Sequence, residues 1–63
     1  MKASQAQDGG RYRLPESNPR HEVGVLECVG WNYSHEWVLF VYFDAQHRRK
    51  IIMLFPSEEI NVI

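Results

Sequence analysis

Cysteine and histidine are the residue types here with the widest chemical range, and the chain has one cysteine and three histidines. Cys28 could act as a nucleophile if His21, His35 or His47 stood beside it as a base. No motif fixes any of these histidines next to it, and its sequence neighbours are mostly apolar. The sequence therefore favours a buried, unreactive Cys28, which is the usual state of a free cysteine.

The histidines could also bind a metal ion, because neutral imidazole is the commonest metal ligand. None of them has a second histidine two or four residues away, and each has polar or charged neighbours. A single cysteine excludes an internal disulfide and any site with several thiolate ligands. We therefore expect exposed histidines, with neither a metal nor a cofactor.

Two charged clusters also have the composition of a functional site. Glu58 and Glu59 could perform acid–base work, but adjacent side chains on one turn point apart, and acids are favoured at the start of a turn. The basic run 48–50 could bind phosphate, but the net charge of −1 provides no general attraction to nucleic acid. We interpret both clusters as structural and assign no catalytic residue.

The spacing of apolar residues predicts an all-β chain. Residues 1–10 are polar and end in two glycines, so we expect a disordered tail (1–10) followed by one folded domain (11–63). Gly24 and Gly30 predict bends or bulges, and Pro56 with the acids after it predicts one short 3₁₀ turn before the last strand. Because small all-β chains protect their strand edges by curling, we expect an SH3-like barrel of about five strands. The predicted strands are residues 11–14, 22–31, 36–43, 48–55 and 60–63.

Two of these strands are apolar on both faces. Residues 37–43 (WVLFVYF) and 51–55 (IIMLF) have apolar side chains whichever way alternate positions point. A chain this short can cover one face of a small sheet, and domains of this size usually need disulfides, a metal or oligomerisation. We therefore predict a homo-oligomer, a dimer or a tetramer, whose interface is formed by Val38, Phe40, Tyr42, Ile52 and Leu54.

Aromatic residues flank the predicted turn at 32–36. Trp and Tyr are frequent anchors at protein interfaces, which favours a contact surface for a partner protein. The alternative is that the two tryptophans cap the ends of the barrel core. The predicted partner-binding residues are Trp31, Tyr33, His35 and Trp37.

The expected location is a reducing cytoplasm. The chain has one cysteine, and its first residues lack the apolar core of a signal sequence. No run approaches the roughly 20 apolar residues that a membrane helix requires. We therefore expect no membrane contact.

The order of motifs resembles that of small SH3-like barrels. A GGRYR opening precedes a loop, and then come EVGVLECV, an apolar strand that ends in Phe43-Asp44, and the closing FPSEEINVI. A glycine-led second strand and a closing F-x-x-x-E-(apolar)-x-(apolar) are similar to the PsaE family of photosystem I and to the variable chain of ferredoxin–thioredoxin reductase. Both are accessory, non-catalytic proteins that dock on larger partners, and the resemblance implies such a role here.

The chain also resembles plasmid-encoded type II dihydrofolate reductase, an SH3-like barrel that forms a homotetramer around a central active-site pore. Val29-Gly30-Trp31 is similar to that family's V-G-W, and Ile52 to Pro56 stand where the family has V-Q-I-Y-P. Met53, Leu54 and Phe55 would replace the glutamine, isoleucine and tyrosine that meet cofactor and folate. An apolar pore cannot orient a nicotinamide by hydrogen bonds, so the resemblance implies the architecture and not the activity.

These observations favour a non-catalytic protein-interaction or assembly module in a bacterial cytoplasm that self-associates and docks on a larger protein. An enzyme of the type II dihydrofolate reductase kind is the first alternative. A small nucleic-acid-binding barrel is the second.

Overall fold

Five antiparallel strands form one sheet in the order β4-β3-β2-β1-β5 in the computed structural model, which describes residues 1–63. The only helical segments are two 3₁₀ turns, Ala3–Gln5 and His21–Val23. The predicted all-β class, with about five strands, is confirmed. The strands are β1 (Arg11–Arg13), β2 (Leu26–Trp31), β3 (Val38–Phe43), β4 (Arg49–Leu54) and β5 (Asn61–Val62).

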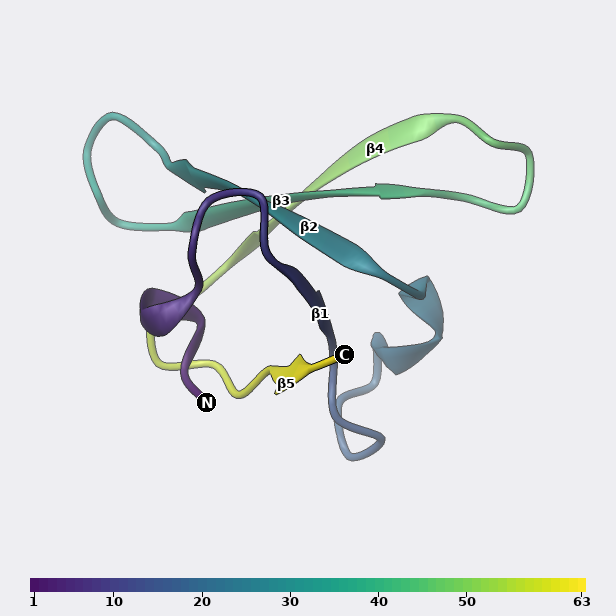
Figure 1. The fold of residues 1–63 in the computed structure, drawn as a ribbon, viewed down its shortest axis with the longest axis horizontal. Coiled ribbons are helices and arrows are strands. Elements are labelled where there is room, and N and C mark those ends of the chain that lie inside the picture. Colours follow the sequence, from purple (N-terminus) through teal and green to yellow (C-terminus); the bar gives the residue numbers. More distant parts are fainter.

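The sheet folds over on itself into two layers. In Figure 1, β2, β3 and β4 cross the top of the view, and β1, β5 and the N-terminal 3₁₀ turn lie below them. Side chains between the layers form the core, because strand residues alternate between the two faces of a sheet. The core consists of Ala3, Tyr12, Leu14, Leu26, Cys28, Val38, Phe40, Leu54 and Ile60.

β2 contains the bulge that its glycine predicts. The pairing of β2 with β3 shifts between Cys28 and Gly30, so that the register skips Val29. Gly30 has a φ of +112°, a conformation that residues with a Cβ rarely adopt. Gly24 has a φ of +95° shortly before β2 begins, which agrees with the bend predicted there.

The predicted disordered tail is wrong, because residues 1–10 are part of the fold. Ala3 is fully buried, and its backbone N–H donates to the carbonyl of Glu58 at 2.8 Å. Gly9 donates to the carbonyl of Cys28, also at 2.8 Å. Polar composition suggests disorder, but here the backbone forms the hydrogen bonds and alanine is small enough to enter the core.

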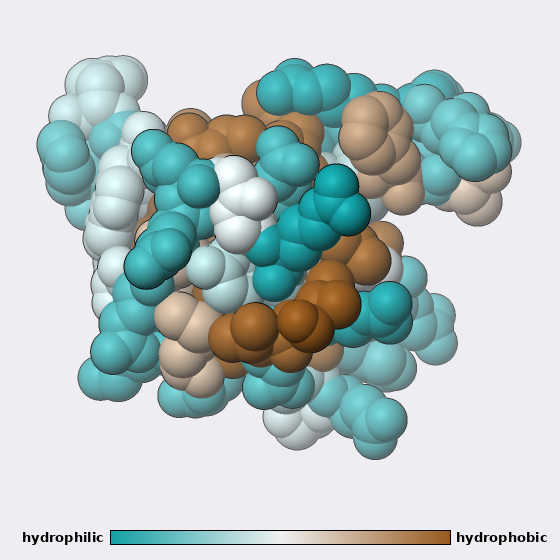
Figure 2. Space-filling model, viewed as in Figure 1, coloured by the Kyte–Doolittle hydropathy of each residue, from teal (hydrophilic) through white to brown (hydrophobic).

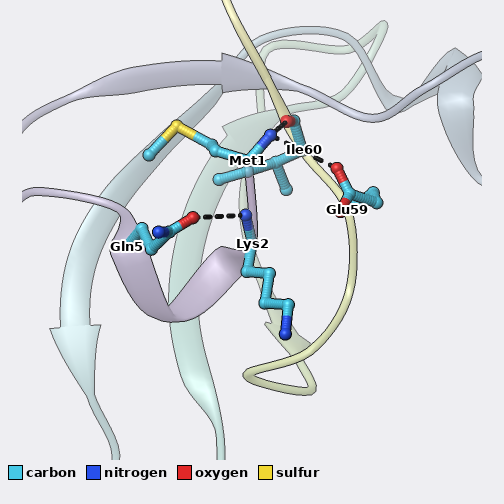
Figure 3. Close-up of polar contacts among 5 residues, drawn as sticks. All are labelled: Met1, Lys2, Gln5, Glu59 and Ile60. Carbon is cyan, nitrogen blue, oxygen red and sulfur yellow. Dashed lines mark hydrogen bonds and ion pairs between the residues drawn. The ribbon is translucent and has the colours of Figure 1, made fainter.

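The first residue is held against the segment that leads into β5. Figure 3 shows the Met1 amino group donating to the Ile60 carbonyl at 2.8 Å and pairing with the Glu59 carboxylate at 3.2 Å. The Lys2 backbone N–H donates to the Gln5 side-chain oxygen at 2.9 Å. The N-terminal segment therefore packs along residues 56–60 and covers one side of the core.

The expected 3₁₀ turn before β5 is a single hydrogen-bonded turn. The Glu58 N–H donates to the Phe55 carbonyl at 3.0 Å, and the Glu58 carboxylate accepts from the Phe55 N–H at 2.8 Å. The same carboxylate pairs with Arg20 at 2.9 Å. Glu58 therefore has a structural role in this turn.

Candidate interaction surface

The side chains of β2, β3 and β4 that point away from the core form a second apolar surface, which we call the outer face. Directly opposite residues in an antiparallel ladder share a face. Leu39 lies opposite Met53, and Val41 lies opposite Ile51. The outer face consists of Val25, Val29, Leu39, Val41, Phe43, Ile51 and Met53, with Trp37 and Phe55 at one end and Arg11, Glu27 and Arg49 as its charged residues.

Much of this apolar surface is in contact with solvent. The exposed fractions are 63% for Phe43, 59% for Ile51 and 49% for Met53. Val41, at the centre, is only 6% exposed because its neighbours cover it. In Figure 2, brown surface lies along the top, over the layer of β2 to β4, and also around the C-terminal end of β5, amid largely teal surroundings.

Part of the outer face is hollowed. An open depression of about 430 Å³ lies over β2 and β3, between the charged residues and the apolar centre. Its lining residues are Arg11, Val25, Glu27, Val29, Val41, Tyr42, Phe43 and Arg49. The depression is concave and mostly apolar with a few charged groups, a composition that suits a contact surface.

The predicted oligomer interface lies on the wrong face of the sheet. Val38, Phe40 and Leu54 are at most 1% exposed and belong to the core, so they cannot meet a second chain. Tyr42 and Ile52 are half-buried and pack against the same core. The error follows from strands that are apolar at every position, since alternation then gives no direction.

One residue in the sequence indicates the correct direction. Glu27 stands between Leu26 and Cys28 in β2, so its side chain belongs to the solvent side while its two neighbours enter the core. Glu27 lies opposite Val41, which transfers the same orientation to β3. The outer face could therefore have been chosen from this acid and a correct hairpin register.

The four predicted partner-binding residues fall into two groups. Tyr33 is 98% exposed at the tip of the β2–β3 hairpin, and the rings of Trp31 and His35 lie 5.9 Å apart nearby. Trp37 is half-buried and stacks on Phe55 with ring centroids 4.2 Å apart. Partner binding by this turn stays a prediction, and Trp37 belongs with the outer face instead.

The hairpin loops have related architectures, each with an Asx residue at its start. The side-chain oxygen of Asn32 accepts from the Glu36 N–H at 2.9 Å, and that of Asp44 accepts from the Arg48 N–H, also at 2.9 Å. In each loop the residue three positions after the Asx is a histidine with positive φ, 59° for His35 and 60° for His47. Asx side chains stabilise such turns by bonding to nearby backbone groups.

The residues with the widest chemical range are not gathered into a site. Cys28 is 1% exposed, as predicted, and burial raises the pKa of its thiol. The three histidines are exposed. No group of three His, Cys, Asp or Glu side chains lies close enough together to hold a metal ion.

Comparison of the chain with protein-family models, with curated proteins and with solved structures finds no match. None of its helical segments has the length and hydropathy needed to cross a bilayer. The outer face is therefore the feature from which a function can be argued.

Proposed function

We propose that this protein is a non-catalytic protein-interaction or assembly module of the cytoplasm that self-associates through its outer face. The observation that carries the proposal is the exposed apolar surface of β2, β3 and β4, on the side of the sheet away from the core. A non-catalytic role is supported by the placement of Cys28, whose thiol is shielded from solvent and from the exposed histidines.

The energetics favour covering this surface. Removing apolar surface from water contributes roughly 25 cal/mol per Å², so an exposed apolar sheet face favours association. A standard interface buries about 800 Å² on each partner, which is less than a fifth of the 4469 Å² surface of this chain. One face of the sheet is therefore enough for a stable interface.

A matched pair of isoleucines tests the proposal. Ile51 and Ile63 are 59% and 60% exposed, but only Ile51 belongs to the outer face. Sedimentation equilibrium at micromolar concentration should show more than one chain per particle for the wild type and for Ile63→Glu. Ile51→Glu should sediment as a monomer, because the new carboxylate would be buried without a partner.

Circular dichroism of each variant establishes that the monomeric species is folded. A wild-type protein that is folded and monomeric throughout this concentration range contradicts self-association. Loss of assembly in both variants contradicts the assignment of the interface to the outer face.

A further inference from the structure

Glu27 and Arg49 are opposite charges on the outer face that do not pair with each other. The ion pairs in the chain are Met1–Glu59, Arg20–Glu58 and Arg48–Asp44, so neither residue is neutralised by a partner. Arg11 lies across from Glu27 on the adjacent strand and also forms no ion pair with it. The outer face therefore includes a carboxylate and a guanidinium that are both available to another molecule.

The strand register places these two charges on opposite sides of the apolar centre. Glu27 on β2 lies opposite Val41, and Arg49 on β4 lies opposite Phe43, two residues further along β3. Neighbouring strands are about 4.8 Å apart, so two strand spacings separate the acid from the base across the sheet. β3, with Val41 near its middle, lies between them.

This arrangement is complementary to itself. A two-fold interface places the same patch of both protomers in contact, so each residue meets a different residue of the other copy. A two-fold axis that runs along β3 places β2 of one copy over β4 of the other. The strands of the two sheets then remain nearly aligned and about 10 Å apart, as in common sheet-on-sheet packing.

We infer that the outer face is covered by a second copy of this chain in this two-fold arrangement, with Glu27 of each copy paired to Arg49 of the other. The inference rests on the proposed function and specifies its geometry. Val41 of the two copies meets at the centre, and two equivalent ion pairs flank it. Pairing also explains how Glu27 can enter an apolar contact, because a purely apolar partner would bury its charge without compensation.

Charge reversal gives a test that only this geometry passes. In Glu27→Arg, both pairs between the copies become Arg against Arg, and in Arg49→Glu both become Glu against Glu. The dimer dissociation constant of each variant should rise about tenfold or more, since close charge pairs at interfaces are strongly coupled. In an equimolar mixture of the two variants, the heterodimer has two Arg–Glu pairs. Association in the mixture should return to within about threefold of the wild type.

Two controls isolate the geometry. Lys50→Glu makes the same charge change one residue away, at an exposed position that alternates to the opposite face, and should change dissociation by less than about threefold. Arg11→Glu mixed with Glu27→Arg should not restore association, because β1 lies outside the overlap of the two sheets. Sedimentation velocity measures all of these species, and circular dichroism establishes that each is folded.

The outcomes separate this inference from the proposed function. If Ile51→Glu abolishes assembly but the two reversal variants bind no better together than apart, the face is correct and the two-fold arrangement is wrong. Restoration by the Arg11→Glu mixture would also overturn it, in favour of a different axis. A monomeric wild type overturns both proposals.

Discussion

Trp37 stacks on Phe55 at one end of the outer face, with ring centroids 4.2 Å apart and ring planes 28° from parallel. The rings belong to the residue before β3 and the residue after β4, next to Val38 and Leu54, which face each other in the core. The stacked pair therefore continues the β3–β4 contact beyond the last pair of the strand ladder.

Replacing Phe55 should weaken this end of the sheet. We expect Phe55→Ala to lower the free energy of unfolding by about 1–3 kcal/mol, because a stacked aromatic pair contributes about 0.5–1.5 kcal/mol beyond its buried area. Tyr33→Ala is the control, since Tyr33 is 98% exposed and its removal should cost less than about 0.5 kcal/mol. Urea unfolding at one fixed protein concentration measures both values, and equal losses would contradict a stabilising role for the stack.

The N-terminal segment should behave as part of the fold rather than as an appendage. Ala3 is fully buried, whereas its neighbour Ser4 is exposed. Ala3→Asp should lower the free energy of unfolding by at least about 2 kcal/mol, because it places an unpaired carboxylate in the core. Ser4→Asp adds the same group at the surface and should change stability by less than about 0.5 kcal/mol. Thermal unfolding that is equally affected in the two variants would contradict the packing of this segment.

The strands and the bulge could be predicted from sequence because they depend on local chemistry. Alternating apolar residues and β-branched side chains locate β2, β3 and β4, and a glycine is favoured at the positive φ that Gly30 adopts. The placement of Ala3 could not be predicted in the same way. Its burial depends on contacts with residues 56–60, more than fifty positions away, and a short polar segment contains no periodicity that indicates such a contact.

The candidate surface was predictable in kind but not in its residues. Apolar character on both faces of β3 and β4 indicates a surface that is left to a partner. The choice between Val38 and Leu39 as core residues depends on where β1, β5 and the N-terminal turn pack, and these segments are too short for their sequences to indicate their position. Only the acid at Glu27 breaks the symmetry between the two faces.

The β3–β4 hairpin should depend on the ionised form of Asp44. Its carboxylate accepts from the backbone N–H groups of Gln46 at 2.8 Å and Arg48 at 2.9 Å, and from the Arg48 guanidinium at 3.0 Å. These bonds, led by that of the Arg48 N–H, hold the pKa of Asp44 below its ordinary value of 3.8. The resulting stabilisation is present above the ordinary pKa and is lost as the pH falls through the lower pKa of the folded state.

The wild type should therefore be more stable than Asp44→Asn at neutral pH, and the difference should shrink below about pH 4. Unfolding free energies of both proteins between acid and neutral pH measure this difference. Asp44→Asn retains one side-chain acceptor, so the comparison isolates the charge. A difference that stays constant through the acid range would show that the carboxylate charge does not stabilise the loop.

Cys28 should be unreactive in the folded protein and should resist ionisation. Its side chain is 1% exposed, and burial raises the pKa of the thiol above its ordinary value of 9.0, with a smaller opposing effect from the Gly30 backbone hydrogen bond. Only the thiolate attacks a thiol reagent, so both low access and a raised pKa slow the reaction. The rate of modification at mildly alkaline pH should rise sharply when the protein is unfolded in urea.

The same shift gives a pH dependence with a definite sign. A thiol whose pKa is raised by folding contributes stability that is complete below the unfolded pKa and is lost as the pH rises through the folded pKa, because the unfolded chain ionises first. The stability of the wild type relative to Cys28→Ala should therefore decline above about pH 9 and stay constant below it. Cys28→Ala also controls for the tyrosines and lysines, which ionise in the same range in both proteins. Equal modification rates in folded and unfolded protein would place the thiol at the surface and restore Cys28 as a candidate nucleophile.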